Sequence, residues 1–413
     1  MVYEKKYANG LRLVVKKMAG LYSVTMGILV GTGACVETDE EDGISHFIEH
    51  MQFKGTKKRS AFEISDAFDR IGAQVNAFTG KDMTCYYSKS TSDHTAEAFE
   101  VLADLFLNAT YPEEEIVREK GVICEEISMN EDTPEDLCLD LLATASFGKN
   151  NYGRNILGTQ KKVNAFTLDM VERYKSERYC PENIVIAFAG DIDFATADAL
   201  VESYFGTLAA GNFKKREFTV LRQKKTLTKK KPIEQLHLAV GYPAPERDHK
   251  LSDALQTMNS ILGGSMSSRL FQEVREKKGL AYSVYSYLSG YEECGSLNIY
   301  AGINPTKLEE AYGAIEEVIR DLKTNGVSEE EFIRGREQMK ASMLFAQEST
   351  SSQMLLYGKY MLYNGETYDF EERYKKMNEM RRSDVLDALT LTFELDARSV
   401  AIVGNIGKKP KFL

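Results

Sequence analysis

Apolar and polar residues alternate along residues 11–15 and 23–30, which predicts two β-strands near the start of the chain. The Gly-rich turn Gly31-Thr32-Gly33 closes the second strand, and a helix is expected to begin near Gly43. The pattern then predicts helices over 61–71, 95–109, 112–130, 134–147 and 167–179, and strands over 74–78, 83–89 and 184–191. Helices and strands therefore mix throughout the first half.

The second half of the chain repeats this order of elements. Strands are expected over 236–242, 283–288, 296–301 and 399–406, and helices over 251–262, 307–322 and 328–347. The segment AIVGNI near the end resembles AFAGDI in the strand that begins at Ile184. We therefore expect a duplicated α+β domain whose second copy has diverged.

Residues 212–232 are rich in lysine and arginine and carry little apolar periodicity, which is typical of a linker between domains. We expect an N-terminal domain over 1–211 and a C-terminal domain over 233–413. A chain of 413 residues is also too long for one core, which agrees with two large domains.

The overall composition narrows the classes of partner. The net charge of −10 disfavours nucleic acid or an anionic membrane as the main partner, so the basic linker is better explained as a solvated connector. The alternative hypothesis of a nucleic-acid-binding protein is supported by the basic linker alone.

The sequence also bears on where the protein is found. No leader-like apolar run and no stretch long enough to span a bilayer is recognised, so the protein is expected to be cytoplasmic. The six cysteines form no CxxC pair and are expected to be reduced thiols.

Two histidines, His46 and His50, lie four residues apart in the helix expected near Gly43. This spacing projects both imidazoles from one helix face, as zinc ligands require. Glu49 lies on the same face and could take a proton from water activated by the metal. The pattern HxxEH also arises by chance on helices with ordinary polar histidines, but two of the five histidines fall here.

A catalytic zinc ion usually has three protein ligands and one water molecule, so a third donor is needed. The helix expected over 112–130 has an apolar stripe, formed by Ile116, Ile123 and Ile127. Helical periodicity places Glu119 and Glu126 on this stripe and turns Glu125 about 100° away. Because an inward carboxylate is costly unless paired or metal-bound, Glu126 is the predicted third ligand and Glu119 a candidate to orient a histidine. The alternative is a solvated acidic helix.

His46, Glu49 and His50, followed by Glu126 after 76 residues, resemble the metal motif of the M16 (insulinase and pitrilysin) family of metallopeptidases. Further segments also resemble this family over nearly the whole chain: GISHFIEHMQFKGT, VNAFTGKDMTCYY, VICEEISMNEDTP and SSRLFQEVREKKGLAYSV. The length of about 400 residues is similar to the M16B subgroup, which includes the mitochondrial processing peptidase beta subunit and bacterial processing proteases.

The resemblance implies two homologous domains, each a mostly antiparallel sheet packed with helices, that together form a half-shell. It implies one zinc ion per chain, bound by His46, His50 and Glu126, with Glu49 as general base and Glu119 as a supporting carboxylate. In the second half it implies that Arg275 and Tyr282 contact substrate and help to stabilise the tetrahedral intermediate. Without the resemblance these two are a surface arginine and a packed tyrosine.

The resemblance further implies an edge strand to which an extended peptide adds by backbone hydrogen bonds, formed by Asn76, Ala77, Phe78 and Thr79. Taken alone, this segment is an ordinary strand with Phe78 in the core.

Together these observations predict a zinc endopeptidase that cleaves peptides or presequence-like segments within a closed chamber, formed by a homodimer. The family also contains inactive members, so the alternative is a non-catalytic scaffold or assembly subunit of the same fold. Such members typically lose metal ligands, and all four metal-site residues are present here.

Overall fold

The computed structural model describes residues 1–211, 213–406 and 410. The chain folds into two compact α+β units. Unit 1 comprises Met1–Ile127, Arg154–Phe218 and Phe345–Asp369, and unit 2 comprises Ser128–Gly153, Thr219–Leu344 and Phe370–Leu413. Each unit has its own sheet and its own large apolar core, so the predicted α+β fold class is confirmed.

Unit 1 is built on a six-stranded sheet. Its strands are, in spatial order, β1 (Val2–Lys6), β2 (Arg12–Lys17), β6 (Ile184–Gly190), β3 (Ser23–Val30), β5 (Thr84–Thr91) and β4 (Gln74–Thr79). Only β2 and β6 pair in parallel, and every other neighbouring pair is antiparallel. The central strand β6 is buried on both faces, which explains why its sequence is a continuous apolar run without alternation.

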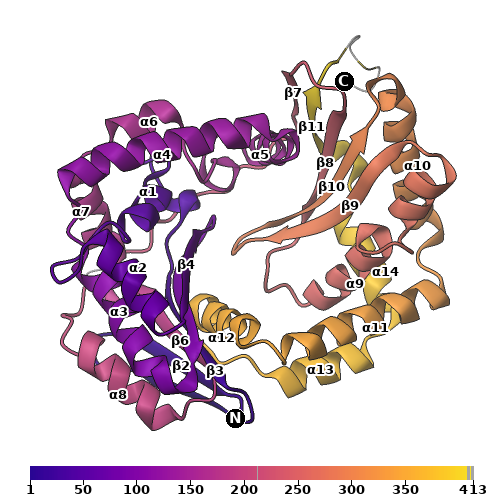
Figure 1. The fold of residues 1–413 in the computed structure, drawn as a ribbon. Coiled ribbons are helices and arrows are strands. Elements are labelled where there is room, and N and C mark those ends of the chain that lie inside the picture. The colour runs from indigo at the N-terminus through magenta and orange to yellow at the C-terminus, as the bar shows by residue number, and fades with distance from the viewer. Residues whose placement is uncertain (212, 407–409, 411–413) are drawn as a thin grey trace. The chain divides into compact units, whose positions relative to one another are not determined.

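Helices cover both faces of this sheet (Figure 1). One face packs against α2 (Ala61–Arg70), α3 (Thr95–Asn108) and α8 (Phe194–Phe205). The opposite face packs against α12 (Thr350–Asn364). A separate small core joins α1 (Ile44–Met51), α4 (Glu113–Asp132), α6 (Gln160–Ala165) and α7 (Leu168–Arg178). This small core carries the helices that hold the predicted metal ligands.

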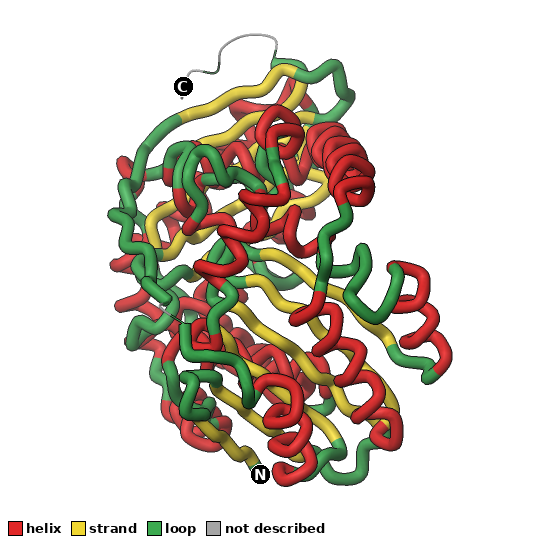
Figure 2. The backbone as a smooth tube through the Cα atoms, turned by 90° about the vertical axis from the view of Figure 1, so that its left-hand side faces the viewer, coloured by secondary structure: helices red, strands yellow, loops and turns green. Residues whose placement is uncertain are grey.

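Unit 2 is built on a five-stranded sheet, seen in yellow with red helices against it in Figure 2. Its strands are, in spatial order, β7 (Thr226–Lys230), β11 (Ser399–Gly404), β8 (Leu236–Ala244), β10 (Gly295–Ile303) and β9 (Ala281–Gly290). One face packs against α9 (Ser252–Gly263), α10 (Leu308–Asn325) and α14 (Arg382–Thr392), and the other against α5 (Pro134–Phe147). The unit also contains α11 (Glu329–Ala346), α13 (Phe370–Glu379) and the π-helix Phe271–Lys277.

The two sheets share one topology, apart from the additional strand β1 in unit 1. The order β2-β6-β3-β5-β4 matches β7-β11-β8-β10-β9, and in each sheet the first of these pairs is the parallel one. The segments AFAGDI and AIVGNI end β6 and β11, which occupy equivalent places. Their glycines, Gly190 and Gly404, have φ of 140° and 141°, a conformation that requires glycine. The duplicated domain predicted from the similarity of these two segments is confirmed.

The compact units differ from the contiguous ranges 1–211 and 233–413 expected from the sequence, because each takes a helix from the other half of the chain. The helix α5 belongs to unit 2, although it precedes the expected boundary, and α12 from the C-terminal half belongs to unit 1. Each of these helices covers the sheet face that the unit's other helices leave open. Apolar periodicity shows that a helix has a buried face but does not show which sheet that face covers.

The predicted linker 212–232 is not wholly a connector. Asn212 lies outside the described residues, but Thr226–Lys230 forms the strand β7, paired in parallel with β11. The strand was missed because it lies at the sheet edge, where four of its five residues are exposed and its lysines face solvent. Charged edge strands of this kind protect a sheet from pairing with other chains.

Several helices were not predicted from the sequence, namely α6, α8, α12, α13 and α14. Strand β1 was also missed, because its residues are mostly solvent-exposed and show no apolar alternation. Among the described residues, no helix combines the length and apolar character needed to cross a bilayer.

Replacing Met354, a fully buried residue of α12, with alanine should destabilise unit 1 by about 2–5 kcal/mol, because the substitution leaves a cavity between the helix and its sheet. Urea unfolding followed by circular dichroism measures this loss. The matched control is Met129→Ala on α4, where the methionine is 70% exposed and should change stability by less than about 0.5 kcal/mol. Equal effects of the two substitutions would contradict the packing described for α12.

Candidate metal centre

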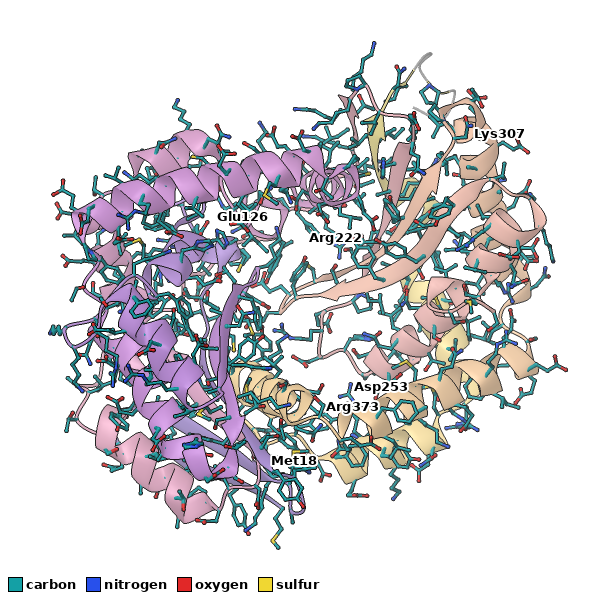
Figure 3. The ribbon with its side chains drawn as sticks, in the orientation of Figure 1. Met18, Glu126, Arg222, Asp253, Lys307 and Arg373 are labelled. Atoms are coloured by element: carbon teal, nitrogen blue, oxygen red, sulfur yellow. The ribbon has the colours of Figure 1, made fainter. Side chains whose placement is uncertain are left out.

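Two helices of unit 1 bring the predicted metal ligands together. His46 and His50 project from α1 with ring centroids 4.5 Å apart. The Oε2 atom of Glu126, on the side of α4 that faces α1 (Figure 3), lies 3.7 Å from His46 Nε2 and 3.5 Å from His50 Nε2. One donor atom from each residue lies within 4.8 Å of the other two, and no other such cluster occurs in the described part of the chain.

This arrangement fits a zinc ion. Donors in a tetrahedral zinc site, at bond lengths of about 2.0–2.1 Å, are separated by about 3.3–3.4 Å, close to the two distances found here. Two imidazoles and one carboxylate also form a ligand set that catalytic zinc sites use. Burial, with a smaller contribution from His50, lowers the pKa of His46 to about 3, so this imidazole is neutral and its nitrogen lone pair is available to a metal.

The helix α4 places its glutamates as the periodicity of its apolar stripe predicts. Ile116, Ile123 and Ile127 are buried, and all three pack in the same core as Ile48 of α1. Glu126 lies beside the histidines, whereas the adjacent Glu125 is exposed. The interpretation that Glu126 and not Glu125 faces α1 therefore agrees with the structure.

Glu119 lies on α4 about two helical turns before Glu126 and supports the site. Its carboxylate, in a residue only 2% exposed, lies 2.8 Å from His50 Nδ1 and 2.7 Å from the amine of Lys54. Burial opposes ionisation of Glu119, but His50 and Lys54 hold its pKa below the usual range. Burial alone would lower the pKa of His50, and Glu119 with the nearby carboxylates raises it. Lys54 was not predicted, because it lies beyond the end of α1, in the turn that follows Met51, where helical spacing no longer indicates direction.

Glu49, the predicted general base, contacts the predicted substrate strand. Thr79 at the end of β4 donates a hydrogen bond of 2.5 Å from its hydroxyl to the Glu49 carboxylate. Burial raises the pKa of Glu49 above its usual value, although Thr79 and His50 oppose the shift. A raised pKa suits a carboxylate that must both accept and return a proton near neutral pH. The contact joins distant parts of the sequence and was not predicted.

The remaining residues of the predicted substrate strand lie along β4, the last strand of the unit 1 sheet. Asn76 is exposed, and Ala77 packs towards the core that contains α2 and α3. Phe78 points to the opposite face, where its ring lies 6.3 Å from that of Tyr87 and 5.7 Å from the Lys359 amine of α12. Phe78 is thus half-buried on the sheet face that α12 covers, and Lys359 of α12 places its positive charge beside the ring.

Arg275 and Tyr282 belong to unit 2, whereas the candidate metal ligands belong to unit 1. Arg275 lies in the π-helix Phe271–Lys277, and its guanidinium is 5.7 Å from the centroid of the Tyr282 ring. Tyr282, at the start of the edge strand β9, is 76% exposed. The two residues therefore lie together, and Tyr282 is a surface residue, not the packed tyrosine expected without the family resemblance. π-helical turns are frequent at functional sites.

Buried polar groups fix the C-terminal end of α1. The Gln52 side chain donates to the Phe106 carbonyl at the end of α3, and its own oxygen accepts from Tyr111 at 2.7 Å and from Lys175 at 3.2 Å. Lys175 also donates to the Phe106 carbonyl at 3.0 Å. Burial lowers the pKa of Lys175 to about 7. None of these residues was predicted to support the site, because their contacts join four separate elements.

Two family models match the chain. The model described as insulinase (peptidase family M16) matches residues 12–160, and that described as the peptidase M16 inactive domain matches residues 165–339. An uncharacterized zinc protease of Bacillus subtilis, YmxG, is 42% identical over 98% of this chain and 99% of its own length. Another uncharacterized zinc protease, from Streptomyces coelicolor, is 36% identical over 91% of this chain and 84% of its own.

Solved structures share the fold. A structure from Pseudomonas fluorescens, titled as a peptidase M16 inactive domain, superposes with a TM-score of 0.92 at 21% identity and covers 99% of each chain. A protease from Helicobacter pylori superposes with a TM-score of 0.90 at 23% identity, covering 98% of this chain and 99% of that one. At these identities the likeness is one of fold.

Replacing Glu126 with glutamine should weaken zinc binding by more than about 100-fold, beyond the loss that partners outside the ligand shell usually cause, because the amide removes an anionic donor. Competition with a chelating indicator measures the dissociation constant. Glu125→Gln is the matched control, since it makes the same change one residue earlier on the exposed side of α4, and it should bind zinc as the wild type does. Equal losses in both variants would contradict the assignment of Glu126.

In the metal-free protein, the contribution of Lys175 to stability should grow as pH rises from 7 towards 10. Lys175 has a folded-state pKa of about 7 against an ordinary value of 10.5, so the unfolded chain binds one more proton in this window. The contribution is at most about 1.4 kcal/mol per pH unit. Urea unfolding at several pH values should show that the stability of the wild type relative to Lys175→Met increases over this window. Identical pH profiles would contradict the lowered pKa.

Proposed function

Because the chain belongs to the M16 (insulinase) family of peptidases, we propose that it is a zinc-dependent endopeptidase whose metal ligands are His46, His50 and Glu126. The observation that carries the proposal is the convergence of these three donors beside the half-buried carboxylate of Glu49. The names of the relatives from Bacillus subtilis and Streptomyces coelicolor, both zinc proteases, support the choice of metal and of reaction. One zinc ion per chain is proposed, since the described residues offer one such cluster.

In this proposal each side chain at the centre has a separate task. A zinc ion bound there supplies Lewis acidity, which favours deprotonation of water near neutral pH and polarises a peptide carbonyl. Glu49 takes the proton from the attacking water and returns it to the leaving amine. Thr79 holds the Glu49 carboxylate in place through its 2.5 Å hydrogen bond. Glu119 fixes the orientation of the His50 ring through Nδ1.

The proposed substrate is an extended peptide or a presequence-like segment that adds to β4 by backbone hydrogen bonds. Two facts support this site: β4 is an edge strand of its sheet, and its residue Thr79 contacts Glu49, the proposed base. Arg275 and Tyr282 are proposed as further substrate contacts, on the basis of the family resemblance. Enclosure of the substrate in a chamber and pairing of two copies of the chain also belong to this proposal.

Replacing Glu49 with glutamine should lower peptide hydrolysis by roughly 100- to 10,000-fold while zinc stays bound, because the amide cannot accept a proton. Cleavage of a mixed peptide pool, followed by mass spectrometry, measures the activity, and metal analysis of the same sample measures zinc. Glu125→Gln is the control for carboxylate loss. Hydrolysis by Glu49→Gln at the wild-type rate would refute the mechanism.

The same experiment addresses the alternative of a non-catalytic scaffold. A wild-type protein that binds zinc stoichiometrically but cleaves nothing in the pool would favour the scaffold and contradict the endopeptidase. A wild-type protein that binds no zinc would contradict the proposed metal centre itself.

A further inference from the structure

The helix α1 begins at a residue that cannot cap it. Its N-cap, Gly43, has no side chain and has φ of 94°, and a Cβ atom there would lie 2.7 Å from the Leu157 carbonyl oxygen. The first-turn amides of a helix have no partner within the helix and require an acceptor from elsewhere. An ordinary serine or aspartate cap is therefore excluded at this position, and another residue must supply the acceptors.

Glu37, six residues before the N-cap, supplies them. Its Oε2 accepts a hydrogen bond of 2.8 Å from the Gly43 amide, and its Oε1 accepts one of 2.9 Å from the Ser45 amide. Both carboxylate oxygens thus bind the first turn of α1, where a negative charge also interacts favourably with the helix dipole. The residue is only 4% exposed, so water cannot easily substitute for it.

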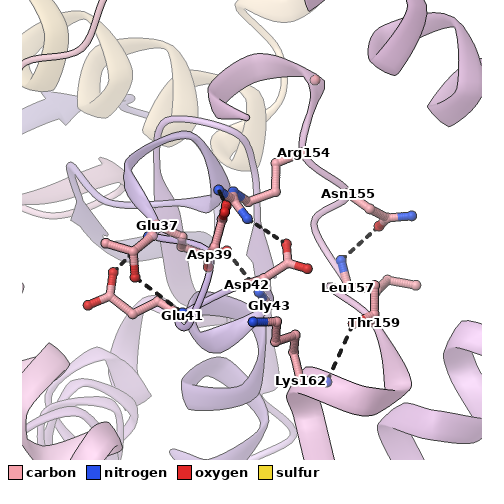
Figure 4. A network of polar contacts seen from close by, with 12 residues as sticks. Glu37, Asp39, Glu41, Asp42, Gly43, Arg154, Asn155, Leu157, Thr159 and Lys162 are labelled. Atoms are coloured by element: carbon pink, nitrogen blue, oxygen red, sulfur yellow. Dashed lines mark hydrogen bonds and ion pairs between the residues drawn. The ribbon is translucent and has the colours of Figure 1, made fainter. Parts of the chain in front are cut away.

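An arginine network holds the same loop (Figure 4). The Arg154 guanidinium, 5% exposed, pairs with Asp39 and Asp42 at 3.0 Å each. Its charge favours the ionised form of Glu37, against a burial that raises the pKa of Glu37 to about 7. Burying a carboxylate has a free-energy cost that hydrogen bonds must offset. The loop keeps this costly group at the start of the helix that carries both histidines.

The two histidines are oriented in different ways. His50 Nδ1 lies 2.8 Å from Glu119, the kind of partner that usually fixes a metal-binding imidazole. His46 Nδ1 is buried, and no described residue offers it a hydrogen bond. The orientation of the His46 ring therefore depends on its packing and on the backbone of the first turn. His46 directly follows Ser45, whose amide Glu37 binds.

We propose that Glu37 is a positioning residue for zinc binding, which acts through the Gly43 and Ser45 amides to hold the first turn of α1 and so aim the His46 imidazole at the metal. This inference rests on the proposed zinc centre and extends it. Glu119 orients His50 by a direct hydrogen bond, whereas Glu37 orients His46 through the backbone. The two glutamates thus serve one ligand each.

The test compares Glu37→Gln and Glu37→Asp with the wild type. Glutamine keeps one acceptor but turns an NH2 group towards the second amide. Aspartate keeps the charge near Arg154 but is one methylene too short to bind both amides in the same way. Each should raise the dissociation constant for zinc by roughly 10- to 100-fold, the range found for partners outside the ligand shell. Competition with a chelating indicator measures zinc, and the visible absorption of the Co²⁺-substituted protein reports on ligand geometry.

The control variant is Glu41→Gln, which removes a second buried carboxylate of the same loop. The Glu41 side chain contacts Thr38 and Arg216 instead of the first turn of α1. At equal thermal stability of the metal-free proteins, the Glu37 variants should bind zinc more weakly than this control and change the Co²⁺ spectrum. When a Glu37 substitution is combined with Glu119→Gln in one protein, the loss in zinc affinity should equal the product of the two single losses to within about twofold. The reason is that the two glutamates act on different histidines.

Two results would overturn the inference. One is zinc affinity and a Co²⁺ spectrum in both Glu37 variants equal to those of Glu41→Gln. The other is a loss of affinity that only follows the loss of thermal stability across all variants, since that would make Glu37 a purely structural residue. If Glu37→Gln does not fold, Glu37→Asp, which retains the buried charge, decides the comparison alone. A wild-type protein that binds no zinc would refute the proposed function instead.

Discussion

The constraint on which unit 1 depends is the convergence of two imidazole nitrogens and one carboxylate oxygen between α1 and α4. His46, His50 and Glu126 meet only if the two helices keep a fixed spacing, which their shared apolar core maintains through Ile48, Ile123 and their neighbours. Burial keeps the His46 imidazole uncharged, which suits it to bind a cation. Packing thus fixes the distance between the donors, and burial fixes the protonation state of His46.

Polar groups then hold the ends and the side of α1, where packing alone would leave rotation free. Glu37 binds the first turn, Gln52 ties the last turn to α3, and Glu119 binds the His50 ring. Each group is almost fully buried and would be destabilising without its partners. Thr79 adds a link from the sheet edge to Glu49. A short helix of eight residues is therefore held by contacts from three directions.

Local patterns in the sequence anticipated much of this arrangement. The apolar stripe of α4 was enough to separate Glu126 from Glu125, because a helix converts spacing directly into direction. The repeated strand ending at Gly190 and Gly404 was enough to reveal the duplication. Apolar patterns did not predict strands that are mostly exposed to solvent, such as β7. They also did not show which of the two sheets a helix packs against, as with α5 and α12. A buried face shows that a partner exists but does not identify it.

The sequence by itself determined the order of most elements, the duplicated α+β fold, and the residues able to bind a metal, since each shows in the spacing or repetition of residues along the chain. Only the tertiary structure decided that Glu37 caps the helix that carries both histidines, that Thr79 contacts Glu49, and that the two halves exchange α5 and α12. These features join residues that are distant along the chain or separated by an irregular loop. No local periodicity encodes them, because they arise only when separate elements pack together.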